Sequence, residues 1–198
     1  MKKISIFIIS FCFLLFNISA NNIHTNDVIV NTKNSTVTWT GSKPGEDHSG
    51  TINISSGKLT FDHGRLVGGE FVIDMSTIKN TDIESARKRE YIEEHLKNED
   101  FFDVEKFPTA KLVITGADPA PDNVYKISAN LTIKDITHKI IFSSHVVVKK
   151  NNFSATANIK IDRTKWDVVY KSGNIFKDLG DKIIHDEINF DIFLLSEK

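Results

Sequence analysis

The sequence is poor in the residues from which redox and metal sites are usually built. Its 198 residues contain one cysteine, Cys12. A single cysteine cannot form an internal disulfide, and it offers no thiolate pair for a zinc ion. The histidines are scattered along the chain without the paired spacing of zinc ligands. We therefore predict no metal site and no thiol chemistry.

An excess of charge of one sign is also lacking. Lysine and arginine number 25 and the acidic residues 26, so the formal net charge is −1. This balance indicates neither nucleic acid nor an anionic membrane surface as a partner. A glycine-rich phosphate loop is missing, and Ser143-Ser144-His145 lacks the glycines of a nucleophile elbow. We expect no catalytic residues, no cofactor and no enzymatic activity.

The sequence has only one long apolar run, and it lies at the N-terminus. Two lysines precede a largely apolar stretch over residues 4–16, and Ser19 and Ala20 then offer small residues for cleavage. These features are typical of a secretory signal peptide. The run is shorter than the ~20 residues that a spanning helix needs, so we expect no stable membrane insertion. We predict a signal peptide over residues 1–20, cleaved near Ala20, and a single domain over residues 21–198.

From residue 21 onward the dominant hydrophobic period is two. Apolar and polar side chains alternate through residues 125–133, 153–161 and 188–194. Such alternation is typical of antiparallel strands with one face on a core and the other in water. Further strands are predicted at residues 36–40, 50–54, 58–61, 66–75, 110–115 and 139–148. Gly68-Gly69 indicates a bulge or bend inside one of them.

One segment departs from this period. Thr81 and Asp82 are typical helix-capping residues, and we predict a helix over about residues 82–97. Its candidate inner-face residues are Ile83, Tyr91, Ile92, His95 and Leu96. The acidic residues Glu93, Glu94, Glu99 and Asp100 are interpreted as a solvated helix end. Many strands and one helix predict an all-β barrel in which a long connection carries a lid or plug.

Short motifs follow one another along residues 21–198. They are Val37-Thr-Trp-Thr-Gly41, His48-Ser-Gly-Thr51, Gly57-Lys-Leu-Thr-Phe61, residues 69–78, residues 94–103 with Phe107-Pro108-Thr-Ala110, residues 130–138 and Ile161-Asp-Arg-Thr-Lys-Trp166. In this order they resemble the YceI-like family of periplasmic lipocalin-like proteins over essentially the whole of residues 21–198. Asp135 and Asp167 depart from the family's pattern.

The resemblance implies an extended eight-stranded antiparallel barrel with the helix near one end, in a periplasmic protein. It also implies a long-chain apolar ligand inside the barrel: a polyisoprenoid, an isoprenoid quinone or a fatty-amide-like lipid. Storage or transport of that lipid is the expected function, and a homodimer is possible because some relatives form dimers. Two alternatives stay open: an enzyme acting on a lipid head group, and a stress-response or scaffold protein with an unused cavity.

A barrel of about eight strands either fills with side chains or holds one ligand. The candidate lining residues are Trp39, Phe71, Ile73, Leu96, Phe101, Phe102, Phe107, Tyr125, Ile127, Leu131, Phe142, Phe153, Ile159, Phe190 and Ile192. They either form a dry core or line a ligand cavity. The three phenylalanines after the helix (Phe101, Phe102 and Phe107) either shape the mouth or pin the helix to the barrel.

Arg163 and Trp166 are the candidate polar residues for a ligand head group. The parity of Arg163 along the preceding strand directs its side chain inward. Its planar guanidinium suits a phosphate, quinone or amide. The alternative is a structural ion pair with Asp162, Asp186 or Glu187, because a buried arginine needs a partner in either case.

Overall fold

The computed structural model describes residues 25–150 and 152–197. The predicted signal peptide and Cys12 lie outside the described residues. The strands are β1 (Thr25–Ile29), β2 (Thr36–Lys43), β3 (Glu46–Asp62), β4 (Arg65–Asn80), β5 (Thr109–Pro119), β6 (Val124–Ile133), β7 (Ile136–Lys149), β8 (Asn152–Asp162) and β9 (Glu187–Leu195). The helical elements are α1 (Ala86–Lys97) and two 3-10 turns, η1 (Arg163–Trp166) and η2 (Gly180–Lys182). The predicted all-β class with one α-helix is confirmed within the described part.

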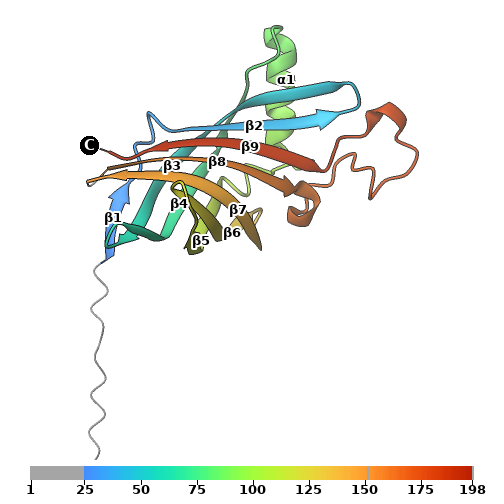
Figure 1. The fold of residues 1–198 in the computed structure, drawn as a ribbon. Coiled ribbons are helices and arrows are strands. Elements are labelled where there is room, and N and C mark those ends of the chain that lie inside the picture. Colours follow the sequence, from blue (N-terminus) through green and yellow to red (C-terminus); the bar gives the residue numbers. More distant parts are fainter. Residues whose placement is uncertain (1–24, 151, 198) are drawn as a thin grey trace, which may run out of the picture.

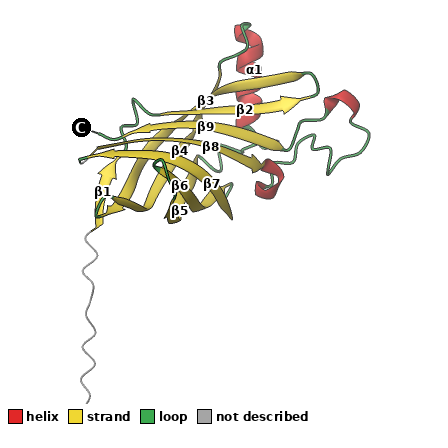
Figure 2. Ribbon diagram, viewed as in Figure 1, coloured by secondary structure: helices red, strands yellow, loops and turns green. Residues whose placement is uncertain are grey.

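The sheet closes on itself. Strands β3, β2, β9, β8, β7, β6, β5 and β4 are neighbours in that order, and β4 pairs back with β3 (Figures 1 and 2). Each of these pairings is antiparallel. The predicted eight-stranded antiparallel barrel is therefore confirmed. Closure pairs the strand edges that an open sheet would leave exposed.

The extra strand β1 continues the line of β2. Both lie along the same edge of β3: Val28 of β1 pairs with Leu59, and Thr38 of β2 pairs with Thr51. Between them Val30, 1% exposed, forms an isolated bridge with Ser196. The first barrel strand is therefore interrupted, and the two halves share one long partner strand.

Side-chain alternation follows the sequence closely. In β8, Phe153, Ala155, Ile159 and Ile161 are buried, and the residues between them are more exposed. The predicted bulge is also present, because the β3–β4 register shifts beside the Gly68-Gly69 pair. A Cβ at Gly69 would lie 2.8 Å from the carbonyl oxygen of Lys58. Only glycine permits that close approach of the two strands without a shift.

Helix α1 begins at Ala86, so the predicted start near residue 82 was wrong. The carboxylate of Asp82 accepts hydrogen bonds from Ser49 N (2.8 Å) and Asn80 Nδ2 (2.6 Å), and it lies 2.9 Å from His48 Nδ1. It therefore ties the end of β4 to β3 and does not cap the helix. The N-cap residue is Ser85, whose side chain makes no capping hydrogen bond.

Glu93 was interpreted as solvated, and this was also wrong. It is 9% exposed and accepts hydrogen bonds from Asn80 N (2.9 Å) and Lys79 Nζ (3.0 Å). Burial alone would raise the pKa of this carboxyl and is the largest single influence. The hydrogen bonds from Asn80 and Lys79 together outweigh it, and the pKa lies below its usual value. Glu93 thus anchors α1 to the end of β4.

Candidate ligand cavity

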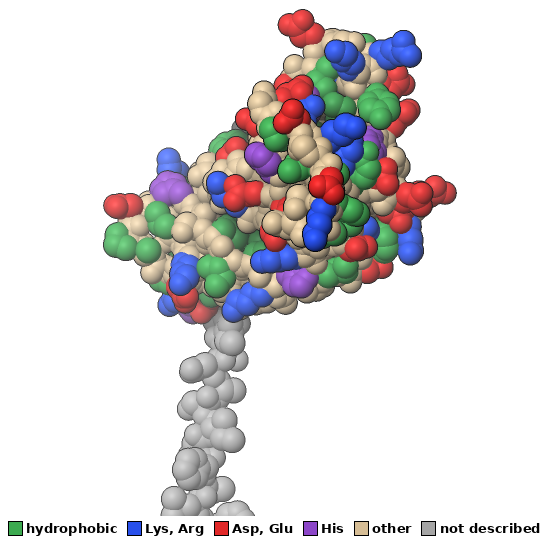
Figure 3. Space-filling view, turned by 90° about the vertical axis from the view of Figure 1, so that its right-hand side faces the viewer, with side chains coloured by type: hydrophobic (Ala, Val, Ile, Leu, Met, Phe, Trp, Pro, Cys, Tyr) green, Lys and Arg blue, Asp and Glu red, His purple; other side chains and the backbone are tan. Residues whose placement is uncertain are grey.

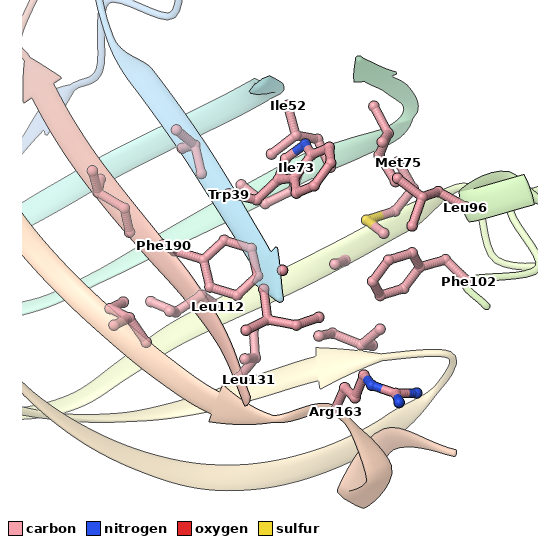
Figure 4. A pocket seen from close by; sticks show the side chains of 18 of the residues that line it. Trp39, Ile52, Ile73, Met75, Leu96, Phe102, Leu112, Leu131, Arg163 and Phe190 are labelled. Carbon is pink, nitrogen blue, oxygen red and sulfur yellow. The ribbon is translucent and has the colours of Figure 1, made fainter. Parts of the chain in front are cut away.

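The barrel is hollow. It encloses a cavity of about 540 Å³, within the range of ~300–1,000 Å³ that is usual for small-molecule sites. Each of the eight barrel strands contributes apolar side chains to its wall, among them Trp39, Ile52, Ile73, Leu112, Leu131, Phe142, Ile159 and Phe190 (Figure 4). The described side chains therefore do not fill the interior as a solid core.

The structure brings most of the predicted lining residues together around this cavity. They are Trp39, Phe71, Ile73, Leu96, Phe101, Phe102, Ile127, Leu131, Phe142, Ile159, Phe190 and Ile192. Three predicted lining residues lie outside the wall: Phe107, Tyr125 and Phe153. Phe107 is half-exposed beside Lys106, whose Nζ lies 5.0 Å from its ring centroid.

Phe153 and Tyr125 mark the closed end of the barrel. Phe153 is 4% exposed and packs on Phe61, with ring centroids 6.0 Å apart. Tyr125 stands at the start of β6, at the same end, and packs against the core cluster. Leu66 is 1% exposed there. Phe153 and Tyr125 lie outside the cavity wall and close the barrel at this end, whereas Leu66 borders the cavity.

The other end of the barrel is the mouth. Helix α1 and the segment 98–108 connect β4 to β5 at this side, and the connection from β8 to β9 lies at the same side. We call residues 163–186 the mouth loop; it lies at the right in Figure 1, and the C-terminus lies at the left. Asp181 and Lys182 of this loop are exposed and also border the cavity. The cavity therefore reaches solvent at the mouth.

An aromatic cluster joins the elements at the mouth. The ring of His95 in α1 lies 5.1 Å from that of Phe101 and 4.8 Å from that of Tyr170 in the mouth loop. Phe101 and Tyr170 are 5.3 Å apart. Phe101 is buried and borders the cavity together with Phe102. Of the two roles considered for the phenylalanines, Phe101 therefore serves both: it shapes the pocket and pins α1.

Arg163 holds the mouth loop together. Its Nε donates to His185 O (3.1 Å), Nη1 to Val168 O (2.7 Å) and Nη2 to Ile184 O (3.0 Å). Nη2 also lies 3.3 Å from Asp186 Oδ1, in an ion pair that is not aligned as a hydrogen bond. The side chain is 1% exposed, and its burial lowers the pKa of the guanidinium although nearby carboxylates oppose the shift. The geometry matches the structural alternative, with most donors committed to the protein.

Asp186 completes this arrangement. Its Oδ2 accepts hydrogen bonds from Ser172 Oγ (2.9 Å) and Asn174 Nδ2 (2.7 Å), and Ser172 is fully buried. His185 N donates to Ser42 O (2.8 Å), which ties the mouth loop to β2. The sequence reasoning missed this loop as part of the site. Its signal was the long interval between strand alternation ending at Ile161 and resuming at Ile188.

Trp166 and Trp39 have different environments. Trp166 is 1% exposed and lies outside the cavity wall; its Nε1 donates to Leu131 O (3.1 Å), and its ring meets His138 edge-on at 5.2 Å. It docks η1 on the β6–β7 hairpin. Trp39 borders the cavity, and its buried Nε1 has no hydrogen-bond partner among the described residues. That N–H is an unsatisfied buried donor within the barrel wall.

Two absences concern only residues 25–150 and 152–197. No group of three or more histidine, cysteine or acidic side chains is placed to hold a metal ion in this part of the chain. No helix of this part has the length and apolar character needed to cross a bilayer.

A family model for the YceI-like domain matches residues 29–194. The chain belongs to the YceI-like family. The resemblance seen in the motifs is thereby confirmed, and the match spans the barrel from the end of β1 to β9. A curated relative, a UPF0312 protein of Shewanella denitrificans, is 26% identical over 98 residues, which are 50% of this chain and 49% of that protein. The chain thus matches about half the length of this relative.

Three solved structures share the fold of this YceI-like chain. Burkholderia cenocepacia BcnA is 20% identical with a TM-score of 0.69, covering 85% of this chain and 99% of that one. A domain from Saccharophagus degradans, described as polyisoprenoid binding and implicated in plant cell wall breakdown, is 12% identical with a TM-score of 0.62, covering 85% and 97%. The Campylobacter jejuni YceI protein is 18% identical with a TM-score of 0.53, covering 100% and 99%.

Proposed function

We propose that this protein binds a long-chain apolar ligand inside its barrel and stores or transports it in the periplasm. The observation that carries the proposal is the cavity of about 540 Å³, apolar along the barrel and plugged at one end by Phe61 and Phe153. A tube of this kind suits an extended chain that enters from the mouth. A polyisoprenoid is the first candidate, and an isoprenoid quinone or a fatty-amide-like lipid fits the same wall.

Apolar burial supplies the affinity in this proposal. A ligand that loses ~400 Å² of apolar surface gains about 10 kcal/mol at ~25 cal/mol per Å², before the costs of ordering and association. Similarity to a domain described as polyisoprenoid binding supports this ligand class. Export to the periplasm is part of the same proposal and rests on the signal-peptide pattern of residues 1–20 and on the family.

Binding is favoured over catalysis by the use of the charged groups at the mouth. Arg163 and Asp186, on which head-group chemistry would depend, hold the mouth loop. Asp82 and Glu93, whose carboxyl pKa values lie below the usual range, hold α1 and the end of β4. An acid with a raised pKa would favour an enzyme more strongly.

Extraction of the purified protein with organic solvent, followed by mass spectrometry, tests the proposal. We expect a long-chain lipid in near-equimolar amount. Delipidated protein should then bind a polyisoprenoid alcohol, a quinone or a fatty amide, followed by the fluorescence of Trp39 in the cavity wall. Recovery of no lipid, together with no binding of any of these probes, would overturn the proposal.

A cavity-filling variant makes the test specific. Ala157 borders the cavity, and Ala157→Phe places a phenyl ring in the space of the ligand. We expect at least tenfold weaker binding and a cost in stability of about 1–3 kcal/mol from overpacking. Ala120→Phe, at an exposed position outside the wall, is the matched control and should bind like the parent. Equal binding by both variants would place the ligand elsewhere.

A further inference from the structure

The wall of the cavity changes character at the mouth. Four cationic side chains and one carboxylate border the cavity among the described residues. The cations are Lys43, Arg163, Lys171 and Lys182, and the carboxylate is Asp181. The deeper wall is apolar. Figure 3 views the molecule from the mouth-loop side, where basic and acidic side chains are mixed over the surface. The positive character is therefore local to the rim of the cavity.

Two of these cations are already committed to the protein. Lys43 Nζ lies 2.7 Å from Glu46 Oε2. Arg163 donates hydrogen bonds to carbonyls of the mouth loop and forms an ion pair with Asp186. Arg163 cannot change partners without breaking contacts that order the mouth loop, and Lys43 already has a carboxylate partner.

Lys171 and Lys182 are different. No ion pair links either ammonium to a carboxylate within residues 25–150 and 152–197. Lys171 Nζ lies 5.0 Å from the ring centroid of Tyr170, which places the charge over the aromatic cluster at the mouth. Both lysines border the cavity from the same loop.

The backbone that carries Lys171 is firmly held. Its carbonyl accepts a hydrogen bond from Ile184 N (2.9 Å), and the next residue, Ser172, is fully buried and bonded to Asp186. Lys171 itself adopts a left-handed φ of 51°, an uncommon conformation for lysine. A network centred on Arg163 thus presents an unpaired ammonium group at the rim of an apolar tube.

We propose that the ligand is an amphiphile with an anionic head group, a carboxylate or a phosphate, which Lys171 and Lys182 bind at the mouth while the tail fills the barrel. The inference rests on the proposed function and narrows its ligand class. Charge-assisted hydrogen bonds from ammonium groups suit either anion. Because the rim is open to water, the gain is modest and screened by salt.

The experiment compares ligands that share a tail and differ only in the head. The probes are laurate against dodecanol, and farnesyl phosphate against farnesol, titrated into delipidated full-length mature protein at low salt. We expect the anion to bind about tenfold tighter than the alcohol in at least one pair, and the preference to fall at high salt. The pair that shows it distinguishes a carboxylate from a phosphate head.

Three variants assign the preference to the rim. Lys171→Gln with Lys182→Gln should bind anion and alcohol alike, and should bind the alcohol as the parent does. Lys177→Gln, on the same loop but outside the cavity wall, should keep the preference. Asp181→Asn should strengthen anion binding, because it removes the one carboxylate at the rim.

The outcomes separate the two proposals. Equal binding of anion and alcohol by the parent, or a preference that survives in the double lysine variant, would overturn the head-group inference and leave the apolar ligand in place. The double lysine variant could instead lose binding to phosphatidylglycerol vesicles and keep the parent's binding of all four probes. That result would assign the lysines to a membrane surface and would also overturn the head-group inference. Failure of all four probes to bind would overturn the head-group inference. The apolar-ligand proposal would fall with it only if no lipid is extracted and no polyisoprenoid alcohol, quinone or fatty amide binds.

Discussion

Replacing Arg163 with methionine removes the side chain that orders the mouth loop and keeps a similar apolar length. In the parent, three carbonyl oxygens accept from the guanidinium at 2.7–3.1 Å, and Asp186 lies 3.3 Å away. The variant leaves the buried Val168 carbonyl and the part-buried Ile184 and His185 carbonyls without this donor, and it leaves Asp186 without its cation. Breaking a buried charged pair in this way costs about 3–5 kcal/mol. We expect that cost to appear mainly as opening of residues 168–186.

Hydrogen exchange of backbone amides is the suitable assay. At 1.4 kcal/mol per factor of ten, the cost predicts at least hundredfold faster exchange in peptides from the mouth loop. The barrel strands should keep their protection, because their ladders do not depend on Arg163. Lys165→Met, which removes an exposed cation in the same 3-10 turn, is the control and should exchange like the parent.

A second substitution checks the physical cause. Adding Asp186→Asn to Arg163→Met removes the uncompensated carboxylate and should restore part of the lost protection. Parent-like exchange of residues 168–186 in Arg163→Met would refute the reasoning, since the loop would then be held by other contacts. Equal protection of the single and double variants would show that the unpaired Asp186 carboxylate contributes nothing to the loss of stability.

Two further predictions concern α1 and the barrel wall. The folded pKa of Glu93 lies below its usual 4.5, so its contribution to stability is complete above pH 4.5 and is lost as the pH falls through the lower folded value. Glu93→Gln should cost about 1–2 kcal/mol near neutral pH and should flatten the fall of melting temperature with acid in a series of thermal melts. An unchanged fall with acid would contradict the assignment. Gly50→Ala should destabilise by at least about 3 kcal/mol in chemical denaturation, because the new Cβ meets the Lys79 carbonyl and lies 2.7 Å from the Trp39 ring. Gly41→Ala, with no atom within 4 Å of its Cβ, is the control, and similar losses in both would refute the packing argument.

The period of two carried most of the fold prediction because burial in a barrel repeats along each strand. It told which face of residues 153–161 points inward, and β8 has that face buried. It gave no position along the barrel axis. Phe153 and Ile159 therefore looked equivalent in the sequence, although Phe153 plugs the closed end and Ile159 borders the cavity.

The failures share one physical reason, which is that polar side chains found partners far away in the sequence. Asp82 reads locally as a helix cap, but the backbone N–H of Ser49 binds it. Glu93 resembles a solvated charge in the sequence, but it is buried and accepts a hydrogen bond from the backbone N–H of Asn80. The parity of Arg163 predicted its direction, but its partners are carbonyls of the mouth loop, which only the folded loop brings to it. An irregular loop has no period from which its contacts can be foreseen.

The chain's last described residues have a practical consequence. Glu197 N donates to Ile29 O (2.8 Å), and Ser196 bridges Val30, so this terminus is fastened at the end of the barrel away from the mouth loop (Figure 1). A tether added at the C-terminus would therefore fix every molecule on a sensor surface with its mouth facing the flow. Entry and exit of a lipid would then be timed on uniformly oriented molecules, with the attachment chemistry at the opposite pole.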